Sequence, residues 1–278
     1  MNNTVKVNAL AFAFQFPGTA PPDTAAFTTR ITEPVDACAA GNSLDPQGLL
    51  ENAEADAPRS LKILWLAEGG GSGFSESRCE TWLASGLTAG APRVLHAGLR
   101  GTRIAWAQTR ALITCPHGAL KDAMDAALRF AQTEWALQEL EQNVHENWSA
   151  VNEDAPLLHE PGGMADARRP VVAARMEQAA VMKARFLRIS LAAEQLELRL
   201  GDVSKRLFGE LADAALLHDR IEMLDDPVQF MMDHYEIIMT RKDEMAARGK
   251  DHHAAFWGHA LEILIIIVLL YQAFFTRH

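Results

Sequence analysis

The pattern of apolar and polar residues divides the chain near residue 117. Before this point, short apolar runs are separated by Pro and Gly, as is typical of strands and turns. The segment 17–59 has weak periodicity and predicts mostly loop. We therefore expect a small α/β N-terminal domain over residues 1–117. Its predicted elements are strands at 5–14, 61–67, 103–107 and 111–115 and short helices at 46–55 and 75–87.

After residue 117, apolar residues recur at three- and four-residue steps, which predicts long helices. One run covers residues 120–151 and a second covers 172–224. The Pro and Gly residues between the runs predict an antiparallel helical hairpin or coiled coil over residues 118–250. Gly201 and Gly209 lie inside the second run, where they favour a bend or an interruption.

The second run is longer than the first, so an antiparallel hairpin leaves part of its apolar seam uncovered. Such a seam is typical of helices that pair with another helix. We expect it to bind a protein partner or a second copy of the chain, which would give a homo-oligomer.

The last part of the chain has the strongest pattern. Residues 254–275 contain one formally charged side chain, Glu262, and the run 263–271 is wholly apolar. A helix of this length is about 33 Å long, close to the thickness of a bilayer core of about 30 Å. The sequence therefore predicts one C-terminal transmembrane helix within a third region, residues 251–278, and a buried core helix is the alternative. The residues expected to lie in the membrane are Trp257, Leu261, Glu262, Ile265, Ile266, Leu269 and Phe274.

The distribution of Lys and Arg predicts an orientation for this helix. Four basic residues precede it and Arg277 alone follows it. By the positive-inside rule, the body of the protein lies on the cytoplasmic or matrix side. We expect a tail-anchored, single-pass protein of an inner membrane, either mitochondrial and facing the matrix or bacterial and facing the cytoplasm, with lipid as one partner. The short apolar stretch 9–16 lacks a basic lead, so no cleavable signal peptide is expected.

Composition narrows the function classes. The formal net charge of −10 argues against a broad nucleic-acid-binding surface. Acidic residues concentrate on the helices, because residues 1–117 hold 9 Lys and Arg against 10 Asp and Glu, whereas the remainder holds 17 against 26. The spacing of Cys38, Cys79 and Cys115 excludes a disulfide scaffold and a CxxC zinc module. We expect no metal and no cofactor.

Two groups of side chains have the residue types of a binding site. His252 and His259 lie seven residues apart on one helical face, and with Glu262 they form a candidate ligand or proton site. The two imidazoles are about 10 Å apart along a helix, too far to bind one ion, and interfacial histidines are the alternative. A basic patch around a predicted hairpin could meet an acidic surface or phosphate, with a solvated strand face as the alternative, and RNA or the ribosome is the corresponding candidate partner. The residues of this patch are Arg93, Arg100, Arg103 and Arg110.

Two further features contain residue types that are found in catalytic or phosphate-binding sites. The glycine-rich loop 69–73 follows a predicted strand, but it lacks the Lys-Ser/Thr pair of a nucleotide triphosphate site, so a flexible turn is the alternative. Cys115-Pro116-His117 places a thiol next to an imidazole, and a structural thiol is the alternative. No spacing demands catalysis, so we expect a protein that is not an enzyme, although the sequence leaves that question open.

Several motifs near the C-terminus are shared with a known family. They are Leu224-Asp225-Asp226-Pro227, which predicts a helix end, then Tyr235-Glu236-Ile237 with Arg241, and then Leu261-Glu262-Ile263-Leu264-Ile265-Ile266-Ile267. These motifs, after an α/β domain and long helices, resemble the required-for-meiotic-nuclear-division family of membrane-anchored proteins. In that family a Trp usually follows the anchor Glu, whereas Ile263 stands here. The resemblance implies a non-enzymatic, membrane-bound assembly that supports translation or respiratory-complex biogenesis.

The expected function is therefore that of a tail-anchored, non-enzymatic scaffold or assembly factor that oligomerises through its helical seam. The alternative is an accessory subunit of a membrane redox or transport complex in which His259 and Glu262 handle protons or ligands.

Overall fold

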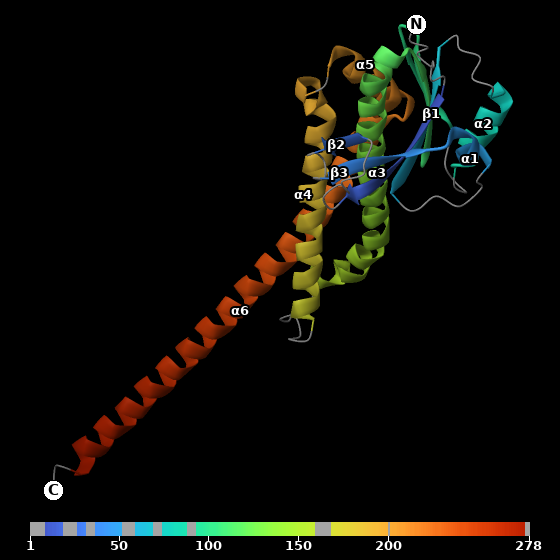
Figure 1. Ribbon diagram of the computed structural model, residues 1–278. Coiled ribbons are helices and arrows are strands. Elements are labelled where there is room, and N and C mark those ends of the chain that lie inside the picture. Colours follow the sequence, from blue (N-terminus) through green and yellow to red (C-terminus); the bar gives the residue numbers. More distant parts are fainter. Residues whose placement is uncertain are drawn as a thin grey trace, which may run out of the picture. The chain divides into compact units, whose positions relative to one another are not determined.

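The computed structural model describes residues 9–18, 27–31, 37–51, 59–68, 74–87, 93–158, 168–199 and 201–275. The chain divides into two compact units. Unit 1 comprises Met1–Asn143 and Ala184–Asp226, and unit 2 comprises Val144–Lys183 and Pro227–His278. Figure 1 shows the elements of both units. Most of the predicted strands and helices are present, and the fold class is α+β.

Unit 1 contains a mixed sheet, which has seven strands among the described residues. Their order across the sheet is β2-β3-β1-β4-β7-β6-β5. The β4–β7 pair is parallel, and the other neighbouring pairs are antiparallel. The strands are β1 (Ala9–Gly18), β2 (Phe27–Ile31), β3 (Ala37–Leu44), β4 (Ser60–Ala67), β5 (Leu95–Leu99), β6 (Thr102–Ala107) and β7 (Arg110–Cys115).

The central strand β4 is buried on both faces of the sheet. Ile63 and Trp65 point to one face and Leu64 to the other, and all three are buried. A continuous apolar run is typical of such a strand, which explains why the sequence predicted it. The expectation of loop over 17–59 was wrong, because β2 and β3 lie there. These strands are rich in Thr, Ala and Gly, so they lack an apolar period, and the pairing of β3 with β1 places them.

Helices cover both faces of the sheet (Figure 1). On one face, α1 (Pro46–Glu51) and α2 (Glu76–Ala84) contribute Leu49 and Trp82 to a cluster that includes Leu64. On the other face, α3 (Leu120–Asp154) follows the short η1 turn (His117–Ala119) and packs Phe130 on Trp106, with 5.0 Å between ring centroids. Phe208 of α5 (Asp202–Ala214) lies 6.1 Å from the Phe130 ring. The core of unit 1 is therefore formed on both sides of β4 and its neighbours.

The long helices follow the apolar periodicity. The first run forms α3, which ends in the 3₁₀ turn η2 (Ala155–Leu158). The second run forms α4 (Arg169–Arg199), α5 and the start of α6 (Leu217–Phe275). The interruption expected at Gly201 is confirmed, since this residue is the N-cap of α5, whereas Gly209 lies inside α5.

The helix end predicted at residues 224–227 was wrong. The α6 helix continues through Pro227, although proline removes one backbone hydrogen bond from a helix interior. Leu224 and Val228 on either side are buried, at 8% and 1% exposure. Packing of these apolar side chains offsets the local cost of the proline.

The predicted transmembrane helix was wrong, and so was that part of the predicted fold class. Residues 254–275 continue α6, but no helix in the described part of the chain combines the length and the apolarity that crossing a bilayer requires. The apolar run 263–271 is shorter than the roughly 20 residues of a typical span, and His259 and Glu262 interrupt the segment before it. The predicted tail-anchored scaffold, its single-pass topology and its inner-membrane location depended on this helix, and they are wrong as well.

Candidate functional site

A groove with acidic walls lies between α4 and α6 within unit 1. Its volume is about 480 Å³. No Lys or Arg is among the residues that line it, so its charge is negative. We call it the acidic groove, and its lining residues are Phe186, Ser190, Ala193, Glu194, His218, Ile221, Glu222, Asp225 and Asp226.

Helical spacing places these side chains together. On α6, His218, Glu222 and Asp225 follow one another at steps of four and three residues, so they share one face of the helix. On α4, Phe186, Ser190 and the adjacent Ala193 and Glu194 also recur at three- and four-residue steps. The buried side chains of Phe186 and Ile221 form the apolar floor. The walls therefore come from two helices that face each other.

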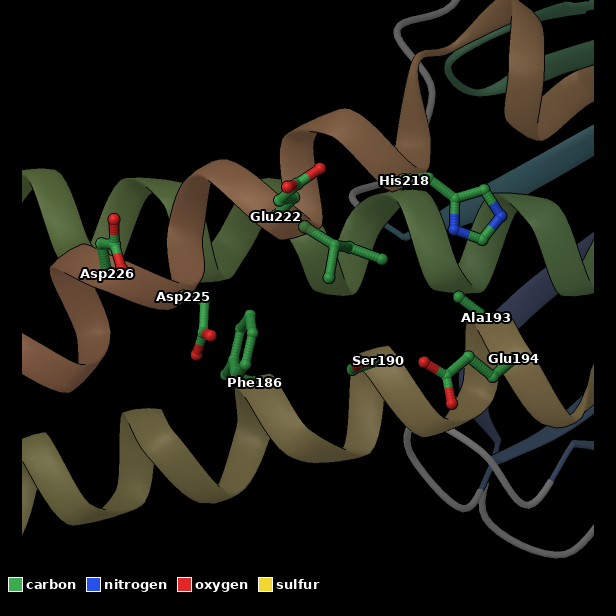
Figure 2. A pocket seen from close by; sticks show the side chains of 9 residues that line it. Phe186, Ser190, Ala193, Glu194, His218, Glu222, Asp225 and Asp226 are labelled. Carbon is green, nitrogen blue, oxygen red and sulfur yellow. The ribbon is translucent and has the colours of Figure 1, made fainter.

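Figure 2 shows how the charged groups are arranged. The carboxylates of Glu194, from α4, and Asp225, from α6, reach into the space between the two helices (Figure 2). Glu222 and Asp226 project from α6 at the rim. All four are exposed, so solvent reaches the carboxylates. Asp225 lies beside Phe186 at one end of the groove and Glu194 lies beyond Ser190 at the other end, so the two carboxylates are spread along the groove (Figure 2).

The chemistry of the acidic groove suits a cation that keeps its water. No group of three or more His, Cys, Asp or Glu side chains among the described residues could hold a metal ion. Mg²⁺ loses water reluctantly and is usually bound by one or two carboxylates with several waters retained. Six waters occupy about 180 Å³ at about 30 Å³ each, which fits within the groove.

The residues expected in a membrane lie on α6. Trp257, Leu261, Ile265 and Ile266 are exposed, between 49% and 65%. Leu269 and Phe274 belong to the same helix, but their side chains lie outside the described ones. The structure thus places these residues on one helix without a bilayer-spanning segment among the described residues.

The candidate proton site is formed in part. His259 Nδ1 lies 3.4 Å from Glu262 Oε2, one helical turn away, and both side chains are more than 70% exposed. The side chain of His252 lies outside the described residues. An exposed pair of this kind contributes little to stability.

The four arginines of the expected basic patch do not form one surface. Arg110 is buried at 3% exposure, donates to the backbone oxygen of Trp82, and stacks over the Trp82 ring. Arg93 donates to the backbone oxygen of Ala214. Arg100 lies in the turn between β5 and β6 with a φ of 48°, and Arg103 is exposed on β6. Sequence proximity did not place Arg110 on a common surface with the other three, because Arg110 caps the end of α2 instead.

The two features considered for catalysis differ in what the structure describes. Cys115 and Cys79 are buried, and burial raises the pKa of each thiol, which disfavours the reactive thiolate. His117 packs edge-on against Trp65, with 5.6 Å between the ring centroids. The glycine loop 69–73 lies outside the described residues.

The acidic groove was not predicted from the sequence. Asp225 and Asp226 were interpreted as a helix stop, and Glu194, His218 and Glu222 were not selected. The excess of acid on the helical region was a signal, and so was the spacing of His218, Glu222 and Asp225 on one helical face. The signal was incomplete, because the α4 wall becomes apparent only when the two helices pack together.

Comparisons with known proteins give no family. No protein-family model matches the chain, and no curated protein matches it. The resemblance to the required-for-meiotic-nuclear-division family therefore stays a prediction.

Three solved structures are similar to the chain over most of its length. The full-length CmaX protein is 10% identical with a TM-score of 0.38, and the match covers 92% of this chain and 83% of CmaX. The CorA magnesium transporter of Methanocaldococcus jannaschii is 11% identical with a TM-score of 0.36, covering 89% and 81%. The ZntB cytoplasmic domain of Vibrio parahaemolyticus is 11% identical with a TM-score of 0.33, covering 88% and 99%.

These TM-scores are too low for an argument about function. The comparisons show no specific partner of this chain. Any functional conclusion has to come from the geometry of the chain itself.

Proposed function

We propose that the chain is a cation-responsive module that binds hydrated Mg²⁺, or a similar hydrated divalent cation, in the acidic groove. The observation that carries the proposal is the pair of carboxylates, Glu194 and Asp225, that reach into this groove from two different helices. One similar structure is a magnesium transporter by name, but the proposal depends on the groove alone.

A cation between these carboxylates would link α4 to α6. Like charges that line one groove repel, and a divalent ion with its water shell offsets this repulsion. Bound cation would then favour the arrangement in which the two helices lie close together. The expected effect of binding is a more stable α4–α6 pair, since a ligand of the folded form raises stability by mass action.

The first test is a calorimetric titration of the whole chain with MgCl₂ in 0.1 M KCl, which screens unspecific attraction to exposed acid. We expect saturable binding. Hexaamminecobalt(III) has a fixed shell that imitates hydrated magnesium and cannot form direct metal–carboxylate bonds. It should compete with Mg²⁺ for the same site. Binding of Mg²⁺ without this competition would contradict the hydrated form of the ion.

Two variants locate the site. Glu194→Gln and Asp225→Asn each remove one carboxylate with little change in volume, and we expect about tenfold weaker Mg²⁺ binding from the loss of one charged contact. The matched control is Asp213→Asn, which removes one exposed carboxylate of unit 1 that does not line the groove. Equal affinity in all three variants, or no saturable heat with the unmodified protein, would contradict the proposed function.

A further inference from the structure

A histidine is buried in the helical packing of unit 2. His234 of α6 is 5% exposed, and its Nε2 atom has no hydrogen-bond partner among the described residues. Its ring stacks on Phe230, with 5.8 Å between centroids and 29° between planes, and meets Tyr235 edge-on at 5.3 Å. The Phe230 ring in turn contacts Trp148 of α3 at 5.7 Å. The imidazole therefore lies in an aromatic layer that joins α6 to α3.

An ion pair next to this layer joins α4 to α3 and lies beside α6. Arg175 of α4 donates to Asp154 at the end of α3, with 2.5 Å between Nη1 and Oδ2, and to the backbone oxygen of Ala150. The charges of Asp154 and Arg175 both act on the Tyr235 hydroxyl of α6, so this side chain lies beside the ion pair. Asp154 is 9% exposed. The ion pair that joins the ends of α3 and α4 is thus adjacent to Tyr235, the neighbour of His234.

The charged groups close to His234 come from both packed helices. Asp154 of α3 is the charge that acts on the imidazole, and Arg175 of α4 already partners this carboxylate. The exposed side chain of Glu153 also pairs with Arg175, with 3.4 Å between Glu153 Oε2 and Arg175 Nη2. A proton on His234 would therefore enter an aromatic layer whose nearest carboxylate already has a cationic partner.

We propose that His234 is a proton-sensitive latch: protonation of its buried ring weakens the packing of α6 on the ends of α3 and α4. A charged imidazole needs hydrogen-bond acceptors, and the aromatic layer offers none to the buried Nε2. Opening of this part of α6 lets water reach the ring. The latch is independent of the acidic groove, which belongs to unit 1.

The direction of the pH effect follows from the environment of the ring. Burial lowers the pKa of His234, and the charge of Asp154 opposes this lowering. When a base has a lower pKa in the folded form than in the unfolded one, stability is unchanged above about pH 6.5. Below about pH 6.5 the open form takes up a proton before the closed form does. Stability therefore falls with falling pH until the pH reaches the lowered pKa of His234 in the folded form. The latch therefore holds at neutral pH and loosens in weak acid.

Hydrogen exchange of the whole chain between pH 7.5 and 5.0, corrected for the intrinsic rate, tests the proposal. This range lies above that in which carboxylates ordinarily titrate. We expect the opening equilibrium of residues 228–241 to rise as the pH falls below 6.5, by up to about tenfold for each pH unit. The α5 helix of unit 1 should show no such rise. A flat profile for residues 228–241 would overturn the proposal.

The variant His234→Phe keeps an aromatic ring and removes the titration, so its profile should be flat. The control His96→Gln removes an exposed histidine of unit 1 outside the acidic groove and should keep the profile of the unmodified protein. A His234→Phe profile like that of the unmodified protein would overturn the proposal. A magnetic-resonance titration of the His234 ring in the unmodified protein decides the question even when the variant does not fold. A midpoint below 6.5 supports the latch, and a midpoint at or above 6.5 contradicts it.

Discussion

Arg220 of α6 binds two carboxylates of α3, and one of them is almost fully buried. Its Nη1 atom lies 2.8 Å from both oxygens of Glu134, and Nε and Nη2 reach the two oxygens of Glu141 at 2.8 and 2.9 Å. The Glu134 side chain is 5% exposed. The hydrogen bonds and charges of Glu141 and Glu134 raise the pKa of Arg220 although burial opposes this, so the guanidinium stays charged. Removing it would leave the Glu134 charge buried without a cation.

We therefore predict that Arg220→Met lowers the free energy of unfolding by about 3–5 kcal/mol, measured by urea denaturation. The matched control is Arg185→Met, whose partner Glu139 lies 3.2 Å away in a pair that is about half exposed. This control should cost less than about 1 kcal/mol. Adding Glu134→Gln to Arg220→Met should recover part of the loss, because the buried charge is then gone. Equal losses for Arg220→Met and Arg185→Met would contradict this account.

Single residues were the least predictable level. The sequence showed that Arg110 and Asp225 are charged, but their roles depend on other elements. Arg110 is buried because its guanidinium donates to the Trp82 carbonyl at the end of α2 and stacks over the Trp82 ring. Asp225 faces a groove because α4 packs opposite it. Neither neighbour is close in sequence, so spacing alone could not reveal them.

At the scale of elements, the apolar period predicted the long helices well and the outer strands poorly. The α3 helix follows a stripe of residues at three- and four-residue steps, and β4 follows a continuous apolar run, so both were predicted. The β2 and β3 strands are placed by backbone pairing with β1 and have no such pattern. The terminal part of α6 does not form the predicted span, because its strongly apolar run is too short for one.

The continuous α6 helix leads to a prediction about Pro227. Proline in a helix interior costs about 3 kcal/mol relative to alanine, because it lacks the N–H group and its ring crowds the preceding turn. Since Val228 is buried and holds the helix in place, we expect Pro227→Ala to raise the free energy of unfolding by about 1–3 kcal/mol in urea denaturation. Met223→Ala, at a position with 75% exposure on the same helix, is the control and should change it by less than about 0.5 kcal/mol. A loss of stability in Pro227→Ala would show that the proline is required for the course of α6.

At the scale of the whole molecule, the division into two units predicts that stability is local. The core of unit 1 surrounds Ile63 of β4, which is fully buried, whereas unit 2 is held by packing around Val172 and Met231 and by the Arg175–Asp154 pair. Each set of contacts lies within one unit. Proteins with separate cores often open in separate cooperative parts, and hydrogen exchange resolves such parts.

Ile63→Ala should therefore increase exchange in β4 and β7 far more than in residues 144–158, since the cavity costs about 2–5 kcal/mol in unit 1. Arg175→Met should do the reverse. It leaves the Asp154 carboxylate without its cation, so exchange should increase in residues 144–158 and 228–241, with little change in the sheet. The comparison is made peptide by peptide on the whole chain, and each variant controls for the other. If both variants destabilised both regions to the same extent, the chain would open as one cooperative body, and the latch at His234 would then be coupled to the sheet as well as to its own helices.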